Sequence, residues 1–194
     1  ERAHALDRLL ALELDILRDG ASALETARAL VVTVPDHLGA WRTIVRLLGE
    51  KPSTDVLAEL RLTALRRLRV LESALPPDGR LPTLLALGRE LSTHRASANE
   101  AADALALAAE IQTGGEEARD HLETLLQLGW LDGAAERAAL RVCGRWRRLA
   151  ELLESDAARA TPADAVAILT ELTEIYATEG ERPNFLRSAL ERLV

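Results

Sequence analysis

The chain has 194 residues, of which 48% are hydrophobic and only 3% aromatic, with 24 basic against 31 acidic side chains. This apolar content excludes generic disorder, and its dominance by Leu and Ala favours helices over strands. The formal net charge of −7, and the absence of any run of roughly 18 apolar residues, argue against nucleic acid and membranes as partners.

Apolar residues recur at separations of three and four along most of the chain, which predicts a series of amphipathic helices and an all-α fold. The first helix is expected at residues 2–18, and Gly20 is expected to end it in the left-handed conformation. The other helices are predicted at residues 22–32, 37–48, 53–75, 81–94, 98–112, 116–128, 131–142, 145–155, 162–178 and 183–193.

Turn-forming residues separate these helices. Pro35 ends the second helix, Ser53 is expected to cap the fourth, and Thr161 is expected to cap the helix that begins at Pro162. The strongest break lies at residues 76–79, which makes 76–80 a candidate hinge, but the helical pattern on both sides favours a single domain across residues 1–194. The chain contains no Met and begins with Glu1, so we expect it to be a segment of a longer polypeptide.

An internal repeat is visible near the N-terminus. Three apolar residues of the first helix recur 34 residues later in the third: Leu10, Ala11 and Leu14 correspond to Ile44, Val45 and Leu48. The helix between them carries small and apolar residues at fixed spacing, closed by a proline: Ala23, Ala27, Leu30 and Pro35. Near the C-terminus, a related spacing joins Leu172 to Tyr176.

This pattern resembles the tetratricopeptide repeat, whose period is 34 residues. The resemblance covers about half the chain, and residues 52–112 do not follow the period. It implies a right-handed α-α superhelix, a solenoid of antiparallel helix pairs in which each pair covers its neighbour. Such stacks bind proteins, so the resemblance implies a scaffold that binds a protein or peptide in a concave groove.

The resemblance also implies candidate binding residues. Arg8 and Arg42 stand one repeat apart, and Arg46 lies one turn after Arg42, with Asp15 on the first helix. In this family the first helix of each pair lines the groove, so these four side chains are expected to face a bound peptide. Guanidinium groups there favour an acidic segment or a chain-terminal carboxylate. The alternative interpretation is an ordinary solvated helix face.

Residues suited to catalysis or metal binding are few. Cys143 lies in an apolar stripe and is expected to be a small buried hydrophobe rather than a nucleophile, and, as a lone cysteine, it fits a reducing compartment such as the cytoplasm. Glu90 with His94, and Glu117 with His121, each place a carboxylate and an imidazole one turn apart. We interpret them as exposed pairs rather than metal half-sites, and expect no cofactor, no metal and no enzymatic activity.

The remaining arginines and the tryptophans suggest structural roles. The clusters 66–69 and 145–148 are expected on the outer surface, hydrated or paired with glutamates. Trp41 and Trp146 are expected to fill gaps between helices, and Trp130, beside Gly129, to be exposed.

The sequence therefore predicts a protein-interaction scaffold. A regulatory or sensory helical domain that controls an attached catalytic or DNA-binding module is the main alternative. An α-helical enzyme or metal protein is less expected. Apolar faces at either end of the stack also leave a homodimer open.

Overall fold

The computed structural model describes residues 1–49, 53–111 and 115–179, and this part of the chain is all-α, without strands. The predicted helix at residues 183–193 lies outside the described residues. Three short helices accompany the α-helices: the π-helix η1 (Glu13–Leu17) and the 3-10 helices η2 (Glu72–Ala74) and η3 (Arg95–Ser97). The α-helices are α1 (Arg2–Leu12), α2 (Gly20–Thr33), α3 (Leu38–Leu48), α4 (Asp55–Leu71), α5 (Pro77–Leu91), α6 (Ala98–Ala109), α7 (Gly115–Leu128), α8 (Gly133–Val142), α9 (Trp146–Arg159) and α10 (Pro162–Glu179).

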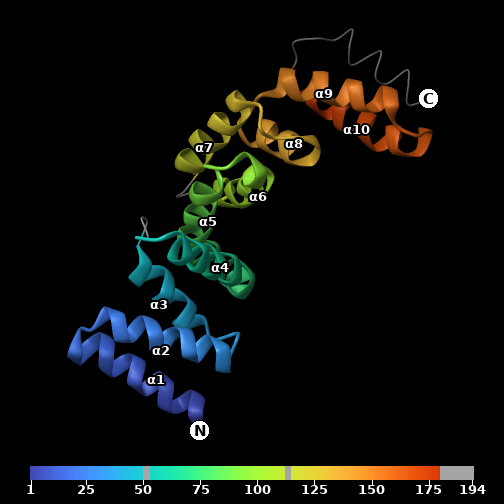
Figure 1. Ribbon diagram of the computed structural model, residues 1–194. Coiled ribbons are helices and arrows are strands. Elements are labelled where there is room, and N and C mark those ends of the chain that lie inside the picture. Colours follow the sequence, from blue (N-terminus) through green and yellow to red (C-terminus); the bar gives the residue numbers. More distant parts are fainter. Residues whose placement is uncertain (50–52, 112–114, 180–194) are drawn as a thin grey trace.

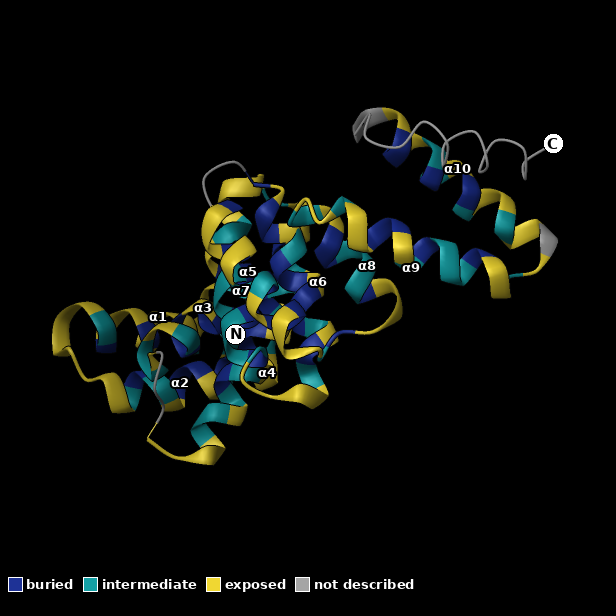
Figure 2. Cartoon of the chain, turned by 90° about the horizontal axis from the view of Figure 1, so that it is seen from above, coloured by how far each residue is buried: buried dark blue, intermediate teal, exposed yellow. Residues whose placement is uncertain are grey.

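The helices succeed one another along an elongated, curved body, from α1 at one end to α9 and α10 at the other (Figure 1). Each helix packs against the next one in the chain, and α6 also packs against α8. Buried residues lie on the sides of the helices that face one another, and exposed residues lie on the outer sides and at helix ends (Figure 2). The Leu and Ala periodicity predicted these buried faces.

The buried side chains form two clusters that meet at α4. The first joins α1, α2, α3 and α4 around Leu30, Ile44 and Leu68, and the second runs from Leu65 of α4 to Tyr176 of α10. Residues on different sides of α4 thus belong to different clusters. The candidate hinge near 76–80 stays a prediction.

The first helical break differs from the one expected at Gly20. Arg18 takes the left-handed conformation, with φ 52°, and Gly20 is the first residue of α2. Asp19 caps α2, because its carboxylate accepts hydrogen bonds from the backbone N–H groups of Ala21 and Ser22, at 3.1 and 3.2 Å. The π-helical turn before Arg18 was also not expected, and it ends the first helix without a glycine.

Two further boundaries correct the predictions. Thr54 rather than Ser53 caps α4, accepting from the backbone N–H of Leu57 at 3.3 Å. The break at residues 76–79 is shorter than expected, because α5 begins at Pro77, where the missing N–H of proline costs no helical hydrogen bond. The cap at Thr161 is confirmed, since its hydroxyl oxygen accepts from the backbone N–H of Asp164.

The tryptophans follow the expectation except at Trp130. Trp41 is buried and its indole N–H donates to the carbonyl of Pro35 at 2.7 Å. Trp146 is partly buried against the second cluster. Trp130 is also partly buried there, so its expected exposure is wrong: it packs beside the buried Leu131 that leads into α8.

Polar contacts also join helices that are not consecutive. Arg66 of α4 and Glu100 of α6 form two parallel hydrogen bonds of 2.8 and 2.7 Å. The side-chain hydrogen bond from Arg66 lowers the pKa of Glu100. Related contacts join α5 to α7, α6 to the start of α8, and α8 to α10: Arg89 with Glu117, Asn99 with Asp132, and Arg141 with Glu171. Each contact joins a helix to its second neighbour in the chain.

Candidate functional site

The stripe of α3 that faces solvent is the best candidate for a binding surface. This helix packs between α2 and α4, and it buries Ala40, Trp41 and Ile44 in the first cluster. Its exposed residues are Gly39, Arg42 and Arg46, spaced three and four apart and therefore on one face. We name this face, formed by Gly39, Arg42 and Arg46, the α3 stripe. It presents two guanidinium groups and a residue without a side chain.

Arg42 is anchored by a buried carboxylate. Its Nε donates to Oε1 of Glu72 at 2.8 Å, and its Nη2 lies 2.8 Å from the same oxygen. The Glu72 side chain, in η2, is 2% exposed, whereas that of Arg42 is 49% exposed. The second carboxylate oxygen, Oε2, is buried and has no hydrogen-bond partner among the described residues. Arg42 is therefore fixed in position and serves first to neutralise Glu72.

Arg46 differs from Arg42 in having no such anchor. It is exposed in the last turn of α3, and it forms no ion pair or hydrogen bond with the part of the chain that the structure describes. Within this part of the chain its guanidinium group is therefore exposed and unpaired.

Arg8 and Asp15, the other two predicted site residues, lie on α1 and η1. Both are exposed and make no ion pair or hydrogen bond with any described residue. The link between α1 and the start of α3 is a different pair: Asp7 Oδ1 lies 3.3 Å from His37 Nε2. His37 caps α3 through Nδ1, which accepts from the backbone N–H of Ala40 at 3.1 Å, so a neutral ring carries its hydrogen on Nε2, facing Asp7.

The glutamates of the two Glu-His pairs form ion pairs with arginines of other helices. Glu90 is bound by Arg61 of α4, whose side chain is buried, and Glu117 is bound by Arg89 of α5. Within residues 1–49, 53–111 and 115–179, no three His, Cys, Asp or Glu side chains are grouped closely enough to hold a metal ion. The carboxylates considered as metal ligands thus engage guanidinium groups.

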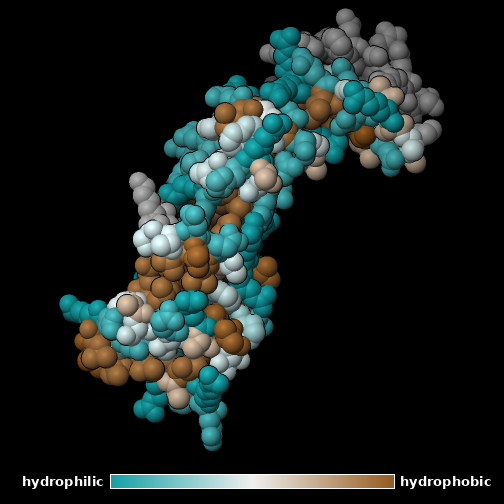
Figure 3. All heavy atoms as spheres, viewed as in Figure 1, coloured by the Kyte–Doolittle hydropathy of each residue, from teal (hydrophilic) through white to brown (hydrophobic). Residues whose placement is uncertain are grey.

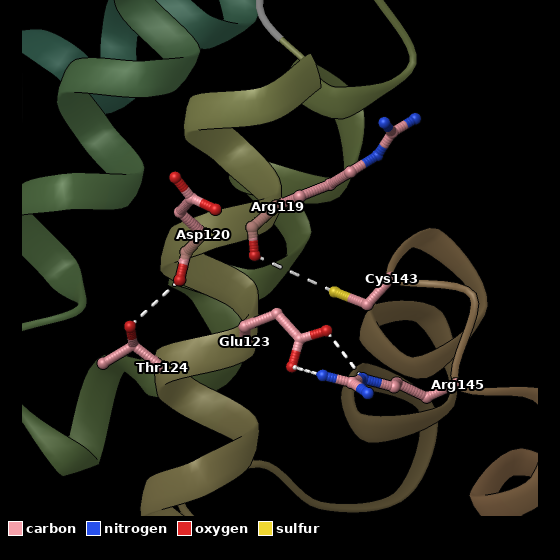
Figure 4. A network of polar contacts seen from close by, with 6 residues as sticks. All are labelled: Arg119, Asp120, Glu123, Thr124, Cys143 and Arg145. Carbon is pink, nitrogen blue, oxygen red and sulfur yellow. Dashed lines mark hydrogen bonds and ion pairs between the residues drawn. The ribbon is translucent and has the colours of Figure 1, made fainter.

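Cys143 is the C-cap of α8, and its side chain points toward Arg119 of α7 (Figure 4). Its side chain is partly buried, and its thiol lies 3.9 Å from the backbone carbonyl of Arg119, to which it donates. Burial and, secondarily, the nearby Glu123 raise the pKa of the thiol to about 11. The thiolate is therefore scarce near neutral pH, which disfavours a nucleophilic role.

The predicted arginine clusters are paired with carboxylates, largely across helices. Arg145 binds Glu123 of α7 with two hydrogen bonds of 2.7 and 2.9 Å (Figure 4). Arg67 binds Asp36, in the turn before α3. The sequence analysis did not identify Glu72 as part of this site. The sequence offers one indication of the contact: Glu72 follows Arg42 by 30 residues, and His37 follows its partner Asp7 by the same number.

None of the helices in the described residues combines the length and the apolar character needed to cross a membrane. The chain matches no protein-family model, and no curated protein or solved structure shows significant similarity to it.

Proposed function

We propose that this chain is a protein-interaction scaffold, a superhelix of antiparallel helix pairs like those of tetratricopeptide repeats, which binds an acidic polypeptide segment on the α3 stripe. The observation that carries the proposal is that the exposed residues of α3, an interior helix of the row, are Gly39, Arg42 and Arg46, while its other residues are buried or partly buried. The elongated row of helices supports it, because such a body offers a long surface in proportion to its core. The proposal assigns no reaction to the chain and locates it in the cytoplasm.

The chemistry of the α3 stripe favours a carboxylate ligand. Side chains four residues apart on a helix lie about 5–6 Å apart at their Cβ atoms, so Arg42 and Arg46 can bind neighbouring carboxylates or one chain-terminal carboxylate. Glu72 neutralises one guanidinium charge and holds Arg42 in place, which lowers the conformational entropy lost on binding. Gly39 adds no side chain to this face, and the ring of His37 lies 3.5 Å from its Cβ position, at the edge of the stripe.

Fluorescence polarisation with short labelled peptides tests this proposal. The probes are an acidic peptide with a free C-terminal carboxylate, the same peptide amidated, and a neutral peptide of equal length. We expect the acidic peptides to bind and Arg46→Glu to weaken them about tenfold or more, a loss of about 1.4 kcal/mol. Arg95→Glu is the matched control, because Arg95 is exposed in η3 and forms no ion pair with a described residue.

Two results count against the acidic-peptide proposal. Equal affinity for acidic and neutral peptides shows that charge does not govern binding. Equal loss of affinity in Arg46→Glu and Arg95→Glu shows that the α3 stripe is not the site, and that only the net charge of the chain matters.

A further inference from the structure

The first helix has a second apolar face that the described part of the chain leaves exposed. Leu10 is buried against α2, and Leu6 and Leu14 pack partly buried beside it. On another side of the same helix, Leu9 and Leu12 are 41% and 42% exposed, and in η1 Ile16 and Leu17 are 71% and 61% exposed. Hydrophobic side chains accordingly gather at the end of the molecule that α1 and η1 form (Figure 3). Four large apolar side chains so close together are uncommon on a surface that meets only water.

The spacing of this exposed face is that of a helix that pairs with another helix. Ala5, Leu9, Leu12 and Ile16 are separated by four, three and four residues, the spacing of the a and d positions of a heptad. Leu17 follows Ile16 at the end of the π-helical turn Glu13–Leu17 and is exposed as well. We call the side formed by Ala5, Leu9, Leu12, Ile16 and Leu17 the α1 face.

Charges beside the α1 face identify the helix that fits it. Arg8 directly precedes Leu9, and Asp15 directly precedes Ile16. Because Arg8 and Asp15 are seven residues apart, they occupy the same heptad position and flank the α1 face on the same side. They are opposite in charge, exposed, and form no ion pair within the described residues. In an antiparallel pair of identical helices, such flanking positions meet each other reciprocally. Arg8 then faces Asp15 of the second copy, and Asp15 faces Arg8 of the second copy.

A parallel pairing fits the same surface less well. It places Arg8 opposite residue 13 of the second copy, five positions further along the helix. That residue is Glu13, which is 7% exposed and has one carboxylate oxygen buried within its own chain. The antiparallel arrangement needs no buried group.

We propose that two copies of this chain associate through their α1 faces, with the two α1 helices antiparallel and Arg8 of each copy paired with Asp15 of the other. The inference concerns a different surface from the α3 stripe, and its failure leaves the peptide-binding proposal unchanged. A dimer of this kind carries two α3 stripes, so a partner with two acidic segments binds more tightly than one with a single segment.

Sedimentation velocity of the whole chain, from about 1 to about 100 µM, tests the inference. The wild type is expected to form a species of twice 21.1 kDa within that range. Leu12→Glu places a charge in the α1 face and is expected to abolish the dimer. Val56→Glu is the control, because Val56 is 75% exposed on α4, away from the α1 face, and its replacement is expected to leave the dimer unchanged.

Exchanging the charges of Arg8 and Asp15 distinguishes the proposed antiparallel dimer from a dimer held together by apolar contacts alone. Arg8→Glu or Asp15→Arg alone brings like charges together and is expected to weaken the dimer about tenfold, whereas the double variant restores opposite pairs and returns the affinity to within about threefold of the wild type. Circular dichroism confirms that each variant is folded. A wild type that stays monomeric at about 100 µM, or that binds a different protein through this face, overturns the inference. So does a double variant no tighter than either single one.

Discussion

Gly88→Val is expected to destabilise the protein by about 3 kcal/mol, lowering the midpoint of urea unfolding followed by far-UV circular dichroism. Gly88 lies on the buried face of α5, and a Cβ atom there meets the Cγ atom of Leu105 at 2.5 Å and its Cδ2 atom at 2.6 Å. Leu105 is completely buried in α6, so its side chain has no space to move into. The close approach of α5 and α6 therefore requires glycine at this position.

Gly79→Ala is the matched control for this substitution. Gly79 lies in the first turn of the same helix, is exposed, and has ordinary contacts of 3.6 Å or more around the Cβ position. Alanine there is expected to stabilise the helix by up to about 1 kcal/mol, because it restricts the unfolded chain and favours the helix. Equal effects of the two substitutions contradict the tight packing of α5 on α6.

Arg42→Ala is expected to destabilise the protein by about 3 kcal/mol in the same unfolding measurement, because it leaves the buried carboxylate of Glu72 without its partner. The double variant Arg42→Ala with Glu72→Leu is expected to recover much of this loss, since no buried charge then remains.

Arg46→Ala provides the comparison on the same helix face. Arg46 has no partner among the described residues, so its removal is expected to change stability by less than about 0.5 kcal/mol. If Arg42→Ala proves as mild as Arg46→Ala, Arg42 does not anchor α3 through Glu72. The pair of variants thus separates the arginine of the α3 stripe that is anchored by Glu72 from the one that has no partner among the described residues.

The positions of the helices could be predicted from the sequence because each buried face repeats Leu and Ala at helical spacing. Thr161 before Pro162 and the buried Trp41 are local signals of the same kind, and both predictions are confirmed. The sequence also showed that residues 52–112 depart from the 34-residue period, and the helix starts agree with this departure. Successive first helices of the expected pairs begin at Leu38, Pro77 and Gly115, so the 34-residue recurrence near the N-terminus does not extend evenly along the chain.

The candidate site was only partly accessible to sequence reasoning. The spacing of Arg42 and Arg46 placed both on one helix face, but the neutralisation of Arg42 depends on Glu72, which follows the whole of α4 and is positioned by a 3-10 turn. The predicted end of the first helix was wrong for a related reason. Gly20 is the residue expected to be left-handed, yet Asp19 prefers to cap α2, which moves the left-handed residue back to Arg18.

The most direct test of the account follows backbone amide resonances of the isotopically labelled chain while the acidic peptide is added. If the peptide binds on the α3 stripe, the amides of Gly39 and Arg46 shift most, their shifts saturate at the dissociation constant found by polarisation, and Arg46→Glu removes them. Shifts that centre on other helices, or that spread evenly over the surface, contradict the assignment of the α3 stripe as the binding site.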